Sequence, residues 1–255
     1  MTWGIFATVI LVGLFVGSFI NVVIYRGPAE WGLVDDSRGT LAKPRSYCPK
    51  CHKPIDILGL MPLIGFAMRR GKCKDCQQSI SIRYPIVETL GAGVIAVCLW
   101  RFGLGVEFLL ASIFGWTLLA LAFVDGETGY LPDALTLPLI VSGIAFNTVD
   151  LFAPWPAAIF GALAGYGAFW LVSAGFQKLR GYEGLGMGDA KLLSAIGAWV
   201  GWHLLPATVF FAAAVTLLVV FARSMPRGGV SGKQAAPFGP GLAAAGFAAL
   251  IWSTF

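Results

Sequence analysis

The sequence contains few charged residues and very few histidines. Of its 255 residues only 12% are charged, whereas 57% are hydrophobic, and the mean hydropathy is +0.78. This composition excludes an ordinary soluble domain. The two histidines, His52 and His203, are isolated from each other in the sequence, so a histidine-based metal or catalytic site has little to build on. The composition therefore predicts a membrane protein with several spans.

Long apolar segments are plentiful. A helical segment of about 17 to 25 apolar residues suffices to span a bilayer. Eight segments approach this length, over residues 3–25, 85–100, 104–124, 134–151, 155–177, 190–205, 206–222 and 237–253. The first lacks a basic n-region and is too long for the apolar core of a signal peptide, so we interpret it as a retained helix. We expect an all-α polytopic membrane protein with about eight transmembrane helices.

One polar block interrupts the apolar pattern. Residues 26–84 hold 11 of the 18 lysines and arginines and four of the five cysteines. We expect a small extramembrane domain here, between helix one (1–25) and a seven-helix membrane domain (85–255). If there are eight spans, every other basic residue except Arg101 lies on the side of this block, which the positive-inside rule then makes cytoplasmic, with both termini outside. The net charge of +5 thus reflects topology, and no nucleic-acid partner is expected.

The cysteines of this block form two C-x-x-C pairs. Cys48 and Cys51 are separated by 21 residues from Cys73 and Cys76, and each pair is followed four positions later by isoleucine. This near-repeat predicts one tetrahedral zinc site with four thiolate ligands, which is structural because no position stays open for substrate. Two disulfides are the alternative, which a reducing cytoplasm disfavours. Cys98, alone in a membrane segment, is expected to be a small core residue.

Acidic residues at the ends of apolar segments are informative, because ionisable groups in membranes are costly and usually functional. Asp125 ends the third segment and Asp189 begins the sixth, and the two intervening spans return both to the same face. Two close carboxylates in a low dielectric cannot easily both ionise, so one keeps a proton while the other acts as a base. This division of labour suits aspartic proteolysis, in which the base activates water and the acid hydrogen-bonds the scissile carbonyl.

Helix capping is the alternative explanation for an aspartate at a helix start. Asp189 and Asp133 both precede apolar runs and suit the N-cap position, and we assign that role to Asp133. Capping explains Asp125 poorly, since it lies at the C-terminal end of its segment, where the helix dipole disfavours negative charge. Glu127 is the runner-up to Asp125. A proton-coupled transporter is a second functional hypothesis, but it predicts acids near mid-bilayer and inverted repeats, neither of which is evident.

Five ordered motifs resemble those of the bacterial type IV prepilin peptidases. They are VGSFINVVIYR (16–26), the paired C-x-x-C block, ISIRYPIVE (80–88), FVDGETGYLPD (123–133) and GMGD (186–189). The last has the form G-x-G-D, and its glycines, Gly186 and Gly188, permit close backbone approach beside Asp189. The resemblance covers most of the chain and makes this family the leading hypothesis.

The resemblance implies a bifunctional enzyme of the bacterial inner membrane. Such enzymes cut the basic leader from prepilins and type II secretion pseudopilins after a glycine, on the cytoplasmic side. They then methylate the new N-terminal amine, usually of phenylalanine, with S-adenosylmethionine. The resemblance implies Asp125 and Asp189 as catalytic residues, the four paired cysteines as zinc ligands, and substrates with a basic leader and an apolar N-terminal helix. Many members have a second aspartate where this chain has Glu127, and we expect little effect on cleavage.

The sequence does not identify the S-adenosylmethionine site. Residues 91–96 have the letters of a dinucleotide-binding motif but lie inside a membrane segment, where small residues serve helix packing. The same interpretation holds for the GxxxG pairs Gly13/Gly17, Gly161/Gly165 and Gly197/Gly201. Glu88 is a weak candidate ligand for an amino group, and an interfacial glutamate paired with Arg83 is the alternative.

Two further hypotheses concern this family. A peptidase that has lost methylation is possible in principle, but the intact cysteine block argues against it. The loop 180–188, with four glycines, has the flexibility to bring the two aspartates together on substrate binding.

Overall fold

The computed structural model describes residues 3–36, 38–180, 186–224 and 237–253, with the side chains of 179, 180, 223 and 224 left aside. These residues form helices and loops, and the described part contains isolated β-bridges but no strand, which confirms the all-α prediction. The chain divides into two compact units, Met1–Ala120 and Leu121–Phe255.

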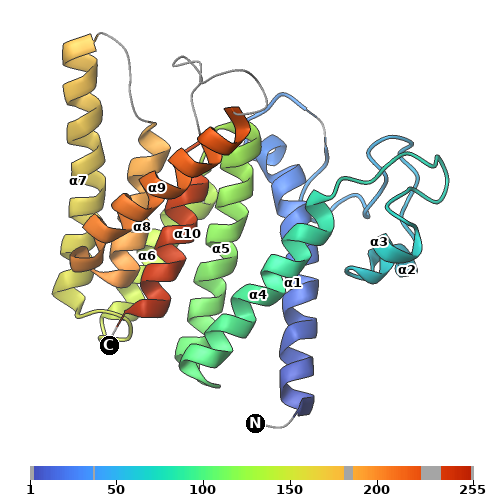
Figure 1. Cartoon of the computed structure of the whole chain (residues 1–255), viewed down its shortest axis with the longest axis horizontal. Coiled ribbons are helices and arrows are strands. Elements are labelled where there is room, and N and C mark those ends of the chain that lie inside the picture. The colour runs from blue at the N-terminus through green and yellow to red at the C-terminus, as the bar shows by residue number, and fades with distance from the viewer. Residues whose placement is uncertain (1–2, 37, 181–185, 225–236, 254–255) are drawn as a thin grey trace. The chain divides into compact units, whose positions relative to one another are not determined.

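The first unit is built on two long helices, α1 (Trp3–Glu30) and α4 (Arg83–Phe102), which pack side by side (Figure 1). Small residues make this close approach possible. A Cβ atom added at Gly17 would lie 2.7 Å from the Glu88 Cα, and one at Gly91 would lie 2.8 Å from the Gly17 Cα. The packing role predicted for Gly13 and Gly17 is thus confirmed, and the glycine-rich segment 91–96 lies inside α4.

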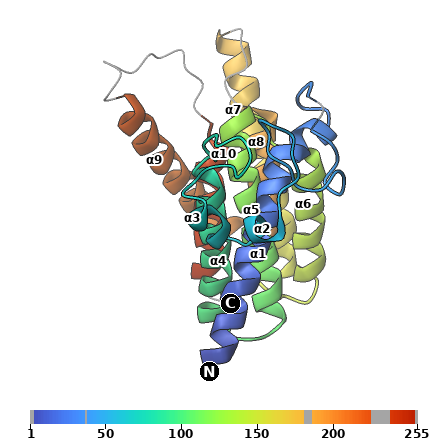
Figure 2. The same cartoon turned by 90° about the vertical axis from the view of Figure 1, so that its right-hand side faces the viewer.

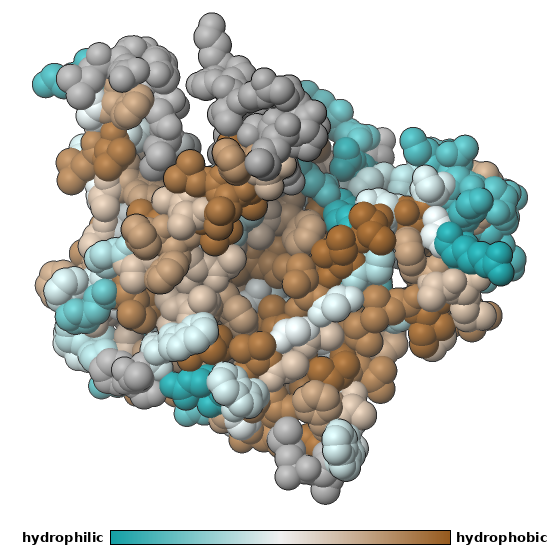
Figure 3. All heavy atoms as spheres, viewed as in Figure 1, coloured by the Kyte–Doolittle hydropathy of each residue, from teal (hydrophilic) through white to brown (hydrophobic). Residues whose placement is uncertain are grey.

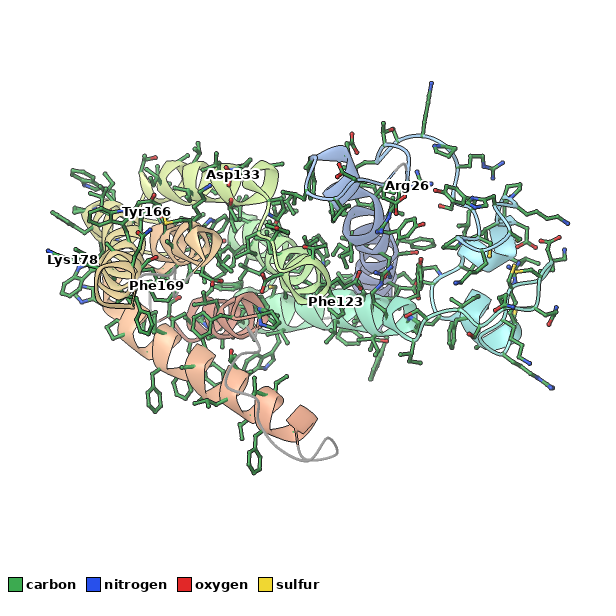
Figure 4. The ribbon with its side chains drawn as sticks, turned by 90° about the horizontal axis from the view of Figure 1, so that it is seen from above. Arg26, Phe123, Asp133, Tyr166, Phe169 and Lys178 are labelled. Atoms are coloured by element: carbon green, nitrogen blue, oxygen red, sulfur yellow. The ribbon has the colours of Figure 1, made fainter. Side chains whose placement is uncertain are left out.

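Between these helices the chain forms the two short helices α2 (Ile57–Leu60) and α3 (Ile64–Met68). Arg26, buried near the end of α1, anchors the segment that leads to them (Figure 4). Its guanidinium donates hydrogen bonds to the carbonyls of Thr40 (3.0 Å), Pro44 (2.7 Å) and Arg45 (3.3 Å). Figure 3 shows hydrophilic residues gathered over this part of the unit, next to apolar ones.

The second unit contains the end of α5 (Val106–Thr128) and is centred on α8 (Met187–Val200), whose residues from Leu192 to Val200 are all buried. Around α8 pack α6 (Asp133–Asn147), α7 (Trp155–Arg180) and α10 (Gly239–Trp252). The helix α9 (Leu205–Ser224), at the left in Figure 2, packs mainly on α10. A Cβ atom at Gly161 of α7 would collide with the Gly197 carbonyl of α8. The second unit thus depends on the glycine pairs that the sequence predicted to serve packing.

Five helical segments are long and apolar enough to cross a membrane, by length and composition: Trp3–Glu30, Arg83–Phe102, Val106–Thr128, Trp155–Lys178 and Trp202–Ala222. With the family comparisons below, they establish a multi-pass membrane protein. α6 and α10 are shorter apolar helices, and α8 has 14 residues. All eight predicted segments are helical, but the count of eight spans stays a prediction.

Two predicted boundaries differ from the structure. α1 continues to Glu30, beyond the predicted end at residue 25. The sixth segment, predicted over residues 190–205, is interrupted at Gly201, which has a φ of +78°. This backbone conformation suits glycine and ends α8 at Val200, before a 3-10 turn, η1 (Trp202–Leu204).

Candidate active site and metal centre

Asp125 lies in the last turn of α5 with only 6% of its surface exposed. Its Oδ2 accepts a hydrogen bond of 3.0 Å from the backbone N–H of Gly239, at the start of α10. The first N–H groups of a helix have no acceptor within the helix, so this donor is available. A Cβ atom at Gly239 would lie 2.6 Å from Oδ2, so the contact needs glycine. Gly239 could not be predicted from the sequence, because a backbone donor has no side-chain signature.

Asp189 lies in the first turn of α8, three residues after the N-cap Gly186. Its carboxylate is near enough to Asp125 for the two to interact electrostatically. Gly188 lets this turn approach the segment before α6, since a Cβ there would lie 3.0 Å from the Leu131 Cβ. The structure thus places the two predicted carboxylates within electrostatic range of each other. The predicted flexible loop 180–188 lies mostly outside the described residues, because 181–185 are not described.

The capping role predicted for Asp133 is wrong. Pro132 occupies the N-cap of α6, no side chain caps this helix, and Asp133 is its first residue. Its Oδ1 instead accepts a hydrogen bond of 2.6 Å from Lys191 Nζ, two residues after Asp189 (Figure 4). Asp189 is not a cap either, since no side-chain cap is found at Gly186. The Asp133–Lys191 ion pair connects the starts of α6 and α8.

Exposure separates Asp125 from its runner-up, Glu127. The Asp125 side chain is buried in the second unit, whereas Glu127 is exposed. An aspartate confined to a buried, hydrogen-bonded position is the better candidate for chemistry that needs a defined proton position.

The four paired cysteines form a compact cluster. The sulfur atoms of all four lie within 4.8 Å of one another; the residues are Cys48, Cys51, Cys73 and Cys76. Cys48 Sγ is 3.9 Å from Cys76 Sγ. A tetrahedral zinc ion with Zn–S bonds of about 2.3 Å separates its sulfurs by about 3.8 Å, so the cluster fits that ion. All five cysteines are free, which goes against the disulfide alternative, and Cys98 is fully buried in α4 as expected.

The two C-x-x-C segments share one backbone geometry. Cys48 N–H donates to the Lys53 carbonyl, and Cys73 N–H donates to the Gln78 carbonyl, both at 2.9 Å. His52 and Gln77, at equivalent positions, both have a φ of 56°. The near-repeat in the sequence is therefore a repeat in structure, as expected of two knuckles that close on one metal ion.

Backbone amides also prepare the cluster for a cation. The N–H groups of Cys76 and Asp75 donate to the Cys73 sulfur and lower the pKa of its thiol to about 7, while burial and the neighbouring thiols raise the pKa of Cys76 to about 11. Because metals bind the thiolate, a lowered thiol pKa favours metal binding near neutral pH. Among the described residues, this is the one group of histidine, cysteine or acidic side chains placed to share a metal ion.

Glu88, the weak candidate for cofactor binding, is a residue of α4 whose surface is only 7% exposed, and it lies on the side of α4 that faces α1. Its Oε2 accepts a hydrogen bond of 2.8 Å from the Leu63 backbone N–H, and its carboxylate is also hydrogen-bonded by the Ser18 side chain. These contacts give Glu88 a role within the first unit, and a role in cofactor binding stays a prediction.

Comparison with known proteins identifies two matching family models. The bacterial peptidase A24 N-terminal domain matches residues 11–102, and the type IV leader peptidase family matches residues 112–221. Prepilin leader peptidase/N-methyltransferase of Aeromonas salmonicida (strain A449) is 39% identical over 99% of this chain and 92% of its own length. The proteins of the same name from Neisseria gonorrhoeae (39% identical; 93% and 87% covered) and Pseudomonas aeruginosa (38%; 95% and 89%) are also similar. No solved structure matches significantly.

Proposed function

The chain belongs to the type IV leader peptidase family, and on this basis we propose that Asp125 and Asp189 are the catalytic pair of a prepilin leader peptidase and N-methyltransferase. The observation that carries the proposal is the placement of Asp125: it is buried, held by the Gly239 N–H, and within electrostatic reach of Asp189. The family match leaves the transporter hypothesis without support, and the relatives' names include both activities.

The hydrogen bond from Gly239 suggests a division of roles. A hydrogen bond donated to a carboxylate favours its ionised form, so Asp125 takes the role of the base and draws a proton from the attacking water. Asp189 then holds the shared proton, hydrogen-bonds the scissile carbonyl oxygen and passes the proton toward the leaving amine. Two close carboxylates can supply both functions because they cannot easily both ionise.

The substrate we propose is a prepilin or pseudopilin with a basic leader and an apolar N-terminal helix. The bilayer would hold that helix, while the leader lies at the cytoplasmic face of the inner membrane and is cut after glycine. The basic bias of block 26–84 supports this orientation through the positive-inside rule.

Zinc and S-adenosylmethionine are the cofactors we propose. The four cysteines would hold zinc in a closed, structural site that shapes the block between α1 and α4. S-adenosylmethionine would supply the methyl group for the new N-terminal amine. We assign the methyl-transfer activity to this block and its junction with α4, with Glu88 as the weak candidate for amine binding.

The proposal is tested with a model prepilin that has a basic leader, glycine at the cleavage position and phenylalanine after it. Intact and N-terminal peptide masses are measured after co-expression with the wild type, Asp125→Asn, Asp189→Asn and the control Glu127→Gln. We expect leader loss plus one methyl group with the wild type and the control, and uncut substrate with either aspartate variant. Full cleavage by Asp125→Asn or Asp189→Asn would overturn the catalytic assignment.

A further inference from the structure

The segment 56–68, which we name the α2–α3 hairpin, exposes an unusual amount of apolar surface for part of a polar block. Most of its large apolar side chains are exposed to between 36% and 76%, and these are Ile57, Leu58, Leu60, Met61, Ile64 and Met68. Soluble surfaces seldom expose so many apolar groups together, and such patches mark contact with a protein or a membrane.

The hairpin is fastened to a point well inside two membrane helices. The Leu63 N–H, at the turn of the hairpin, donates to Glu88, the sixth residue of α4. On α1, Glu88 lies against Gly17 and Ser18, about 12 residues or roughly 18 Å before the end of that helix at Glu30. The turn of the hairpin is therefore level with the middle of α1.

The neighbouring surfaces at this level are those of a membrane span. Phe15 and Phe19 of α1, on either side of Gly17, are exposed to 56% and 55%. Ile86 and Leu90 of α4, on either side of Glu88, are exposed to 44% and 45%. Since these residues belong to segments apolar enough to cross a bilayer, we expect lipid to cover them. The turn of the α2–α3 hairpin lies at the same depth.

Many backbone N–H groups of the hairpin have acceptors within the protein, which favours a place in lipid. Polypeptide can enter lipid only if its polar backbone groups have partners within the protein. Leu63 N–H is bound by Glu88, and the Asp56 side chain accepts from Gly59 N–H at 3.1 Å. Acceptors within the hairpin also serve the N–H groups of Leu60, Met61, Ile64, Gly65 and Ala67. Glu88 thus supplies the acceptor that the turn itself lacks.

We propose that the α2–α3 hairpin is embedded in the bilayer, with its apolar side chains among the acyl chains of the leaflet on the side of the cysteine cluster. The block between α1 and α4 is then a membrane-inserted element as well as an extramembrane domain. Arg70 and Lys72, which follow α3 and are exposed, suit anionic lipid headgroups at the leaflet surface. The partner of this surface is lipid.

The test places the photoreactive residue benzoylphenylalanine at Leu58 or at Met68 of the full chain. The chain is reconstituted in vesicles of phosphatidylethanolamine and phosphatidylglycerol. Matched controls carry the probe at Lys50 or Gln77, which are exposed in the same block. After irradiation we expect lipid-mass adducts at Leu58 and Met68, and none at Lys50 or Gln77. Failure to form lipid adducts at both hairpin positions overturns the proposal.

The same samples with a prepilin added distinguish a second occupant. Adducts to prepilin in place of lipid at Leu58 and Met68 would make the hairpin a substrate-docking surface and would overturn the lipid assignment.

A fluorescence measurement of depth in the membrane does not depend on crosslinking chemistry. A fluorescent residue at Met68 should lose most of its emission to lipids brominated on their acyl chains, whereas the same residue at Gln77 should be quenched by aqueous iodide. Iodide quenching at Met68 equal to that at Gln77 would also contradict the insertion.

Discussion

The Asp125 carboxylate is held by the backbone amide of Gly239. Gly239→Ala should lower kcat for leader cleavage about tenfold to a hundredfold with little change in KM, because a Cβ atom 2.6 Å from Oδ2 displaces the carboxylate from its donor. The measurement is steady-state cleavage in detergent or vesicles, with methyl transfer to a previously cut pilin as the assay of folded enzyme.

Gly246→Ala on the same helix is the matched control, since its Cβ would meet Ile196 side-chain carbons, the nearest at 2.6 Å, away from the carboxylates. Equal cleavage kcat for wild type and Gly239→Ala would contradict the role of this amide.

A more direct test of the hydrogen bond replaces the backbone amide of residue 239 by an ester. The ester removes the N–H without adding an atom, and an ester at Leu242 serves as the control. The Leu242 N–H donates to the Phe238 carbonyl of the same helix.

Asn147 is fully buried and joins the end of α6 to α8. Its Nδ2 donates to the carbonyls of Ala198 (2.9 Å) and Trp199 (3.1 Å), and its Oδ1 accepts from the N–H groups of Phe152 and Ala153. Asn147→Ala removes these four buried hydrogen bonds and should lower the free energy of unfolding by about 3 kcal/mol. Equilibrium unfolding in mixed micelles measures the change. Ser142→Ala in the same helix should change it by less than about 1 kcal/mol, and equal effects would contradict the argument.

Single residues could be predicted from the sequence where their chemistry or their spacing is distinctive, and the structure places the four paired cysteines in one cluster and the two aspartates within electrostatic range. Asp125 and Asp189 stood out because ionisable groups are costly in a membrane, and the paired cysteines stood out by their C-x-x-C spacing. Gly239 did not, because its contact with Asp125 spans 114 residues and involves the backbone alone. Asp133 was misassigned because its partner, Lys191, lies 58 residues away and only the fold brings them together.

At the scale of elements, the contact between α7 and α8 depends on glycine. Gly161→Val should prevent this contact and lower both the yield of folded protein and cleavage, since the Gly197 carbonyl occupies the space of any side chain at 161. Gly167→Val, on the same helix with nothing within 4 Å of its Cβ, should be tolerated. The two variants are compared by the yield of monodisperse protein in size-exclusion chromatography and by the rate at which that fraction cleaves the substrate. Similar yields for both variants would show that α7 and α8 do not need this close approach.

The apolar segments of the sequence predicted the position of every long helix, but they did not predict where each helix ends. Hydropathy averages over a window and cannot register a backbone change at one residue, so the end of α8 at Gly201 was missed. It also cannot separate a helix in contact with lipid from one enclosed by other helices. α8 is apolar because α6, α7 and α10 surround it, and this explains how 14 residues resemble a span.

At the scale of the whole molecule, the proposed zinc site and the proposed catalytic pair lie in different compact units. Cys73→Ser should therefore abolish the binding of one zinc ion per chain and reduce methyl transfer, while leader cleavage persists. Metal analysis and the two mass assays test this separation. Loss of cleavage equal to that of Asp189→Asn, in protein that remains monodisperse, would contradict it.

Low pH should weaken zinc binding at the cysteine cluster. Zinc binds thiolates, so protons compete with the metal, and zinc affinity should fall as the pH is lowered through the Cys73 thiol pKa of about 7. Zinc release to a chelator, followed between pH 8 and pH 5, measures the trend. Affinity that is constant over this range would argue against thiolate ligation.

The bond between Asp125 and Gly239 also bears on when the protein becomes active during its own synthesis. A nascent chain that has emerged as far as α8 already carries both aspartates, yet the amide that holds the first of them belongs to the last helix. The carboxylate gains this amide donor only after that helix has left the ribosome and folded against it. On the proposed assignment, a half-made chain therefore carries both aspartates before it is able to cut a prepilin.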